Sequence, residues 1–252
     1  MRFDKIYVEL SDICGLKCQF CPSTKGMRGI MPLDLFSKIA LECAKFTKLI
    51  TFHILGDPLK IKNLKEYLLV AKKYNLKVEI TTSGIYVDEF DFLLESPIKQ
   101  INFSLDAIME VESKVFRDIA FNKIFEFCRY KDSSNNDIFI NLRIQNRIDS
   151  KTLELKDILK QEFDLVDLNS NVRVGKKTII VFREPFLWNS NDNKSDTNNT
   201  GFCYGLISHF GILSNGDVVP CCIDAGGDIV LGNLKSQSLN DILYGNRALD
   251  IR

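Results

Sequence analysis

Short apolar runs of period two alternate along this chain with segments of helical periodicity, and this alternation restricts the fold more than any other feature. Residues 6–10 alternate apolar and polar side chains, and residues 33–46 then carry apolar side chains at helical spacing. Strands that alternate with helices are typical of βαβ units and a parallel sheet. About six such units precede residue 185, so we predict an α/β fold containing a partial (β/α)6 TIM-like barrel.

The predicted elements follow from these patterns and from the turn residues between them. Asn63 with Glu66 resembles a capping box and predicts a helix start. Strands are predicted at residues 6–10, 49–55, 77–82, 101–105, 138–144, 166–168 and 178–182. Helices are predicted at residues 33–46, 64–71, 88–94, 121–128 and 155–159.

The C-terminal quarter of the chain differs in character from the predicted barrel. Residues 186–200 include an asparagine-rich polar stretch and are predicted to be a linker or loop between a core of residues 1–185 and an extension of residues 201–252. Asn215-Gly216 between two apolar runs predicts a β-hairpin, and Ser238 is expected to cap a short helix. The extension is therefore predicted to be a small α+β unit containing a hairpin.

Composition narrows the class of protein. Lysine plus arginine equals aspartate plus glutamate, at 33 each, which gives no electrostatic reason to expect a nucleic-acid or membrane partner. The N-terminal stretch lacks the apolar run of a signal peptide, so a cytoplasmic location is expected. In a reducing compartment the eight cysteines call for an explanation other than disulfides. With only two histidines, metal chemistry would depend on thiolates.

Three of these cysteines form the central motif, Cys14-Gly-Leu-Lys-Cys18-Gln-Phe-Cys21. Three thiolates on one short loop can bind three corners of a 4Fe–4S cluster and leave one iron open to a substrate or cofactor. The same spacing also fits an apolar helical stripe, but Gly15 and Pro22 interrupt the segment. Zinc is the second alternative, although zinc sites usually pair two CxxC motifs.

The motif resembles the signature of the radical S-adenosylmethionine (SAM) superfamily, including the aromatic Phe20 before the third cysteine. Four further stretches are similar to motifs of that family, in the same order along residues 5–182. The resemblance implies cofactor-binding roles for Gly56, Asp57 and Pro58 (a GGEP-like motif), Ser83 (a TNG-like turn), Ser104 and Arg143. The GGEP position departs from the family pattern, because Leu55 replaces the first glycine and the shorter Asp57 replaces the glutamate.

The resemblance also implies a function. Such an enzyme cleaves SAM reductively to a 5′-deoxyadenosyl radical, which abstracts hydrogen from a peptide or small-molecule substrate. It implies a 4Fe–4S cluster and SAM as cofactors, and an electron donor such as flavodoxin or ferredoxin. The alternative is a metal-binding module without catalysis, holding zinc or a degenerate cluster, or a truncated inactive relative. The substrate itself is not readable from the sequence.

The remaining cysteines divide into two groups. Cys43 and Cys128 fall on apolar helical faces and are predicted to be core residues. Cys203, Cys221 and Cys222 resemble the start of a SPASM or twitch extension, which implies an auxiliary iron–sulfur cluster. This sequence has no further CxxC motif after Cys222 to complete the cluster ligands. Three alternatives for these cysteines therefore stay open: Cys222 is a third ligand, the chain is a truncated form without the second cluster, or the cysteines are structural thiols.

Overall fold

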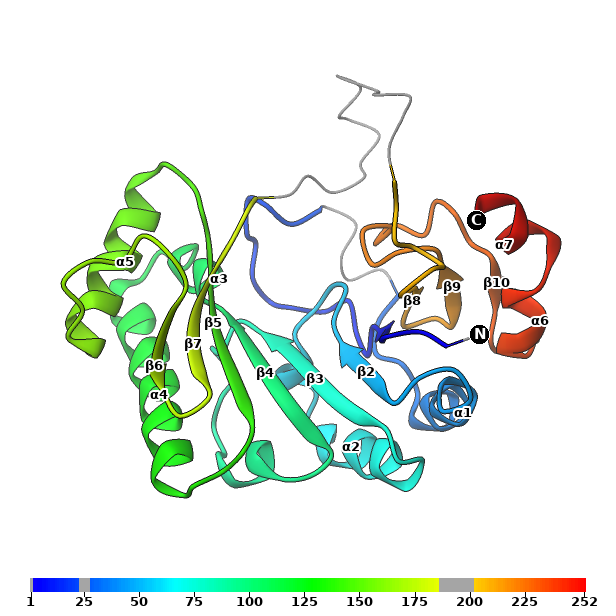
Figure 1. Ribbon diagram of the computed structural model, residues 1–252, viewed down its shortest axis with the longest axis horizontal. Coiled ribbons are helices and arrows are strands. Elements are labelled where there is room, and N and C mark those ends of the chain that lie inside the picture. Colours follow the sequence, from blue (N-terminus) through cyan, green and yellow to red (C-terminus); the bar gives the residue numbers. More distant parts are fainter. Residues whose placement is uncertain (1, 23–27, 186–201) are drawn as a thin grey trace. The chain divides into compact units, whose positions relative to one another are not determined.

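The computed structural model describes residues 2–22, 28–185 and 202–252 (Figure 1). The predicted linker at residues 186–200 lies outside these described residues. Contacts divide the chain into two compact units. The first contains Met1–Gly15, Phe20–Val78 and Leu187–Arg252, and the second contains Leu16–Gln19 and Glu79–Phe186.

The N-terminal part of the first unit is a βαβα arrangement. Strand β1 (Ile6–Val8) pairs in parallel with β2 (Leu49–Phe52), with Ile6 opposite Ile50. Helix α1 (Leu33–Cys43) contacts helix α2 (Leu64–Lys73). Buried aromatic side chains fill this part of the core, where Phe36 makes edge and tilted ring contacts with Phe52 and Tyr67.

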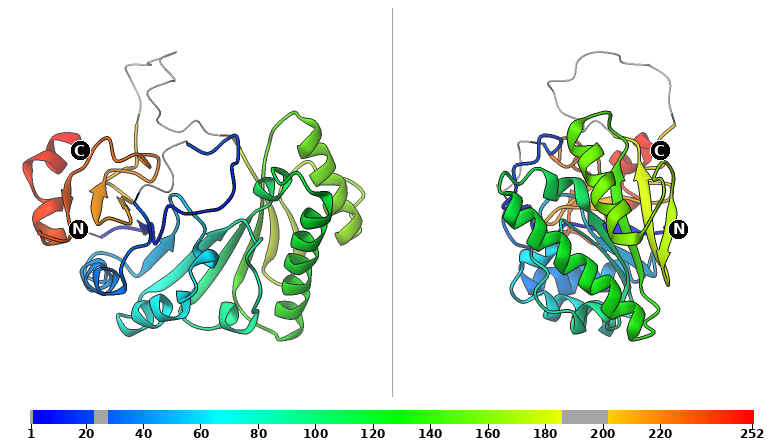
Figure 2. Two further views of the ribbon diagram at one scale, coloured as in Figure 1. Left: turned by 180° about the vertical axis from the view of Figure 1, so that it is seen from behind. Right: turned by 90° about the vertical axis from the view of Figure 1, so that its left-hand side faces the viewer.

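The C-terminal part of the first unit adds further strands beside β1. Strand β8 (Gly211–Ile212) pairs in parallel with β1 and antiparallel with β9 (Asp217–Val219), which pairs antiparallel with β10 (Gly232–Asn233). Helices α6 (Leu239–Leu243) and α7 (Asn246–Ile251) contact each other and complete the chain, as the red segments of Figure 2 show. The predicted hairpin is confirmed, as is the Ser238 cap, whose hydroxyl accepts from the Asp241 nitrogen at 3.1 Å.

The second unit has parallel strands with helices on one side. Strands β4 (Ile98–Ser104), β5 (Phe139–Gln145) and β7 (Thr178–Arg183) pair in parallel, and β6 (Val172–Gly175) pairs antiparallel with β7. Helix α3 (Leu105–Met109) follows β4 directly and contacts both α4 (Lys114–Ser133) and α5 (Ser150–Phe163). Figure 2 shows α4 and α5 on the same side of β5 and β7.

Strand β3 (Lys77–Thr82) begins in the first unit and ends in the second. Among the described residues the strands follow the order β10-β9-β8-β1-β2-β3-β4-β5-β7-β6, which is an open sheet. The predicted α/β fold, with a partial barrel and a small C-terminal extension that contains a hairpin, is confirmed.

Three local predictions need correction. Residues 166–168 are not a strand: Asp164 adopts a left-handed conformation that ends α5, Val166 is fully exposed, and the next strand is β6. Residues 88–94 hold only a 3₁₀ turn, Asp91–Leu94. The helix start predicted at Asn63 is confirmed, since α2 begins at Leu64, but the Asn63 side chain makes no cap hydrogen bond and donates to the Glu66 carboxylate at 2.9 Å. In each case the local residue pattern predicted a structure or contact that the folded chain does not form.

No helix in the described part of the chain is both long enough and apolar enough to cross a bilayer.

Candidate metal centres and cofactor-binding elements

The cysteine triplet lies on the loop that follows β1. Cys14, Cys18 and Cys21 are half-buried and form no disulfide, and Phe20 beside the last of them is half-buried too. None of the eight cysteines of the chain forms a disulfide. The loop offers the accessible thiols that an iron–sulfur cluster requires.

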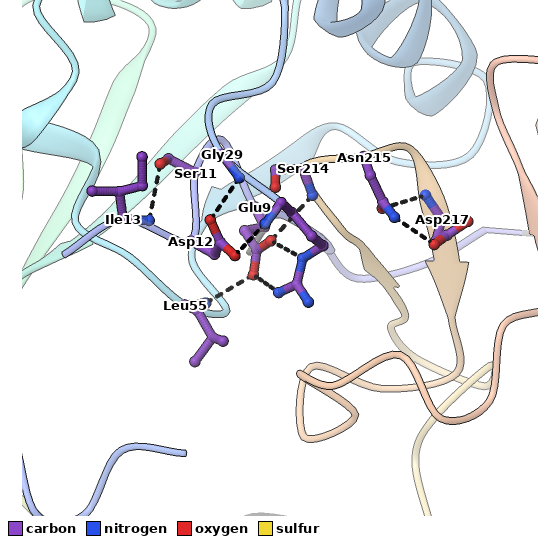
Figure 3. Close-up of polar contacts among 10 residues, drawn as sticks. Glu9, Ser11, Asp12, Ile13, Gly29, Leu55, Ser214, Asn215 and Asp217 are labelled. Atoms are coloured by element: carbon purple, nitrogen blue, oxygen red, sulfur yellow. Dashed lines mark hydrogen bonds and ion pairs between the residues drawn. The ribbon is translucent and has the colours of Figure 1, made fainter. Parts of the chain in front are cut away.

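A buried carboxylate at the end of β1 organises the surroundings of this loop. The Arg28 guanidinium donates to both Glu9 oxygens, from Nε at 3.0 Å and from Nη2 at 2.9 Å. Glu9 also accepts from the backbone nitrogens of Leu55 at 3.2 Å and Ser214 at 3.1 Å (Figure 3). Glu9 is fully buried, so each of these bonds forms away from water. One side chain thus joins the loop after β2 and the β8–β9 turn to the segment that follows the triplet.

Asp12 closes the base of the cysteine loop. Its two carboxylate oxygens accept from the backbone nitrogens of Arg28 at 2.8 Å and Gly29 at 2.9 Å. A β-bridge between Ser11 and Ile30 continues this contact. Asp12 precedes the first cysteine by two residues and is fully buried, so the loop leaves and re-enters the fold at one fixed point (Figure 3).

The GGEP-like stretch packs against the start of the same loop. Gly56 has a φ of +73°, and a Cβ there would lie 2.0 Å from the Ser11 carbonyl oxygen, so only glycine fits. The Asp57 nitrogen donates to the Ile13 oxygen at 3.2 Å. The buried Asp57 carboxylate accepts from the Leu59 nitrogen at 3.0 Å and caps the 3₁₀ turn that Pro58 begins.

The other cofactor candidates lie in the second unit, at the ends of its strands. Ser104 ends β4 and lies directly opposite Arg143 on β5, so the structure brings these two residues together. The Ser83 hydroxyl accepts from the Ile85 nitrogen at 3.3 Å in the turn after β3. Gly84 in that turn has a φ of +84°, and a Cβ there would lie 2.4 Å from the Ile124 side chain.

Asp106, two residues beyond Ser104, is a partly buried acid that the motif comparison did not assign a role. Its carboxylate accepts from the Gln145 nitrogen at 2.8 Å and so ties the first turn of α3 to the end of β5. Burial raises the pKa of Asp106 from 3.8 to about 6, against the lowering effect of the backbone hydrogen bond from Gln145.

Cys43 on α1 and Cys128 on α4 are buried core residues, as predicted. Burial raises the pKa of both thiols, that of Cys128 to about 12. Thiols that hold their protons this firmly are poor metal ligands, which separates them from the cysteines on the loops.

The C-terminal cysteines form a second cluster of donor atoms. Ligand atoms of His209, Cys221 and Cys222 all lie within 4.8 Å of one another. The Cys222 thiol donates to Cys221, and this hydrogen bond, with a further contribution from His209, lowers the pKa of Cys221 to about 4. The same hydrogen bond raises the pKa of Cys222. A thiolate at Cys221 is the form of cysteine that binds iron.

Cys203 is near this cluster without belonging to it. Its sulfur accepts from the Gly205 nitrogen at 3.3 Å, and a Cβ on Gly205 would lie 2.8 Å from the Pro220 oxygen. Cys203 itself is exposed. Gly205, two residues after Cys203, thus lies close to the Pro220 backbone. The residue whose side chain contacts Cys221 is His209.

One small apolar cluster contacts both cysteine-bearing loops. Cys21 of the triplet and Cys222 of the extension pack against the same buried group, together with Tyr7. The members of this group are Ile54, Leu55, Leu213, Val219 and Ala225. Such packing excludes water from one side of each cysteine.

Sequence reasoning missed Glu9, Asp12 and Arg28, which hold the triplet loop, and it gave His209 no role. The role of Glu9 could have been suspected from the sequence. An acid in an alternating strand, five residues before a cysteine motif, has to be either solvated or paired with a cation. The partner Arg28 carried none, since its pairing depends on how the chain returns after the loop. The two-residue spacing between Asp12 and Cys14 likewise did not indicate that Asp12 binds the far end of the loop.

An open α/β sheet with a loop of three cysteines after its first strand is the arrangement expected of a partial-barrel iron–sulfur protein. The chain belongs to the radical SAM superfamily, whose model matches residues 8–142, more than half of the chain. A second model, described as the SPASM iron–sulfur cluster-binding domain, matches residues 203–252. These families imply 4Fe–4S clusters and SAM as cofactors, and the half-buried cysteines of the triplet fit such a cluster.

Known proteins agree with this assignment. A GTP 3′,8-cyclase from Synechocystis sp. is 27% identical over 186 residues, which are 66% of this chain and 50% of that protein. The chain thus spans about half the length of this curated relative.

Solved structures share the fold. SuiB of Streptococcus suis, bound to its precursor peptide SuiA, has a TM-score of 0.69 at 16% identity over 100% of this chain and 67% of that one. BtrN in complex with AdoMet and 2-DOIA has a TM-score of 0.63 at 18% identity over 100% and 86%. The anSMEcpe protein with AdoMet and the Cp18Cys peptide has a TM-score of 0.60 at 14% identity over 98% and 81%.

Proposed function

We propose that this chain is a radical SAM enzyme that cleaves SAM reductively and abstracts hydrogen from a peptide or small-molecule substrate. One observation carries the proposal: a loop with a CxxxCxxC motif leaves and re-enters the fold at a point fixed by Asp12 and Glu9. A rigid base is what a cluster needs if it must hold one iron open at a constant position.

Cys14, Cys18 and Cys21 would hold the 4Fe–4S cluster. When bound, the cluster and SAM supply an electron and a carbon–sulfur bond that breaks to give a 5′-deoxyadenosyl radical. The contribution of the protein is orientation. The Gly56–Pro58 backbone packs against residues 11–13, which supports the assignment of this stretch to the methionine amino group of SAM.

The remaining cofactor contacts are assigned to Phe20, Ser83, Ser104 and Arg143. The register of β4 and β5 supports two of them, because Ser104 and Arg143 are cross-strand partners at the C-terminal ends of parallel strands. Ligands of open parallel sheets bind at those ends. A hydroxyl and a guanidinium side by side suit the polar groups of a nucleoside and a carboxylate.

The substrate class is inferred from the structural neighbours, and each bound ligand is a property of that neighbour alone. SuiB binds the precursor peptide SuiA, anSMEcpe binds a peptide, and BtrN binds 2-DOIA. A peptide or a small molecule is therefore proposed for this chain. A reduced flavodoxin or ferredoxin in the cytoplasm would supply the electron, since a low-potential donor is required to reduce such clusters.

The domain organisation belongs to the same proposal. Residues 1–185 would form the radical SAM core, residues 186–200 a linker, and residues 201–252 an extension with an auxiliary cluster. The SPASM match and the thiolate at Cys221 support an iron–sulfur centre in the extension. Cys203, Cys221 and Cys222 are its thiol candidates.

Anaerobic reconstitution with iron and sulfide tests the function. The enzyme should turn brown, bind about four iron and four sulfide at the triplet, and release 5′-deoxyadenosine when SAM and dithionite are added. A colourless protein that binds zinc and leaves SAM intact would contradict the proposal.

A further inference from the structure

The C-terminal donor cluster contains a histidine that no sequence motif assigns. His209 Nε2 lies 3.4 Å from Cys221 Sγ, and Cys222 Sγ completes the group within 4.8 Å. Tetrahedral bonds of about 2.3 Å to sulfur and about 2.0 Å to nitrogen place neighbouring donor atoms about 3.5–3.8 Å apart. The separation between His209 and Cys221, a hydrogen-bond distance in this structure, is thus also close to that of two ligands of one metal ion.

The imidazole is oriented as metal-ligating histidines are. Its other nitrogen, Nδ1, lies 3.0 Å from the Ser208 hydroxyl oxygen, which leaves Nε2 facing the sulfur. Tyr7 packs edge-on against the ring, with centroids 5.5 Å apart and an interplanar angle of 74°. A polar partner on the distal nitrogen fixes the tautomer and direction of a ligating ring.

The backbone around His209 is also fixed. Residues 205 and 209 form a β-bridge, and the Leu206 nitrogen donates to the His209 oxygen at 2.8 Å. On the opposite side, the Asp224 nitrogen donates to the Cys221 oxygen at 3.1 Å. The buried Asp224 carboxylate accepts from the nitrogens of Asp228 and Ile229, so the turn after Cys222 is ordered as well.

We propose that His209 binds, through Nε2, the metal centre of residues 203–252 together with Cys221 and Cys222, which gives this centre mixed imidazole and thiolate ligation. The inference rests on the proposed function only in that an iron-containing centre forms in the extension. A neutral imidazole in place of a thiolate reduces the negative charge on the iron and raises its reduction potential. The extension would therefore accept electrons more readily than an all-cysteine centre.

The test uses the full chain with the triplet removed, Cys14→Ser, Cys18→Ser and Cys21→Ser, so that signals come from the extension alone. This parent variant is reconstituted anaerobically with ferrous iron and sulfide after growth on 15N-histidine, and the reduced centre is studied by pulsed EPR. We expect a directly coordinated 15N coupling. Because the chain has only two histidines, His53→Gln is a matched control and should keep the coupling, whereas His209→Gln should lose it.

A further variant separates ligation from folding. His209→Cys should keep its iron, lose the nitrogen coupling and shift the midpoint potential to lower values. The proposal is overturned if the parent binds no iron, if it shows no nitrogen coupling, or if the coupling survives in His209→Gln. SAM cleavage by the wild-type chain is measured in parallel. Cleavage without nitrogen coupling would reject only the assignment of His209 as a ligand. Coupling without cleavage would reject only the proposed function.

Discussion

Glu9 and Arg28 form a buried, bidentate ion pair that joins the end of the first strand to the segment returning from the cysteine loop. The carboxylate is fully buried, and the guanidinium side chain is 11% exposed. An ion pair so poorly solvated contributes geometry more than net stability, but removing one partner leaves the other charge buried alone.

Glu9→Gln should therefore destabilise the protein by about 3 kcal/mol, because Arg28 loses its counter-charge in a site without water. Urea unfolding of the metal-free protein, followed by circular dichroism, measures this. The matched control is Lys123→Gln, which breaks an exposed pair with Asp88 and should cost less than about 1 kcal/mol. Equal effects of the two substitutions would show that Glu9 does not anchor the loop.

Gly56→Ala should impair both folding and SAM binding. A Cβ at this position would lie 2.0 Å from the Ser11 carbonyl oxygen, and because that atom is backbone, residues 11–13 would have to move. Gly29→Ala is the control, because Gly29 has a similar φ of +81° but no atom within 4 Å of its Cβ position. Isothermal titration of the reconstituted protein with SAM should show weaker binding for Gly56→Ala by at least tenfold. Near-equal affinities for the two variants would contradict the close packing of this stretch.

The comparison of sequence with structure shows where local patterns suffice. The apolar alternation predicted β1 and β5 well, because in both strands buried side chains alternate with partly exposed ones. It failed at residues 166–168, where Val166 is exposed and the antiparallel strand β6 instead pairs with β7. The cysteine triplet could be recognised in the sequence because its three residues lie close together on one loop.

The contacts that position the triplet were not predictable in the same way. Glu9 meets Ser214 across 205 residues, and such a pair depends on the whole topology. His209 meets Cys221 across the β8–β9 hairpin, so the hairpin predicted at Asn215-Gly216 accounts for their proximity, whereas the role of His209 was not predicted.

Substitutions of two cysteines should separate chemistry from packing. Cys18→Ala should abolish SAM cleavage, since it removes a cluster ligand from a half-buried loop position. Cys43→Ala should retain cleavage and lower stability by about 1 kcal/mol, because it leaves a small cavity in the core. The amount of 5′-deoxyadenosine formed per protein and the thermal unfolding midpoint are the two measurements. Equal loss of cleavage in both variants would remove the basis for assigning Cys18 to the cluster.

Asp106 should make stability depend on pH in an unusual direction. Burial raises its pKa in the folded state to about 6, above the ordinary 3.8, so the folded protein binds this proton more tightly than the unfolded chain does. The stability that comes from this group is complete below about pH 4 and is lost as the pH rises through about 6. Asp106→Asn keeps an acceptor for the Gln145 nitrogen and does not ionise.

This variant should therefore be more stable than the wild type at pH 7.5, by about 1–3 kcal/mol, with the difference shrinking towards pH 5. Asp149→Asn provides the opposite case, because the backbone hydrogen bond from Thr152 lowers the pKa of Asp149. Its charged form stabilises the fold above about pH 4, so this variant should be less stable than the wild type at pH 7.5 and approach it in acid. Urea unfolding from about pH 3 to pH 8 gives both differences. A stability difference for Asp106→Asn that stays constant over this range would mean that Asp106 does not titrate within it.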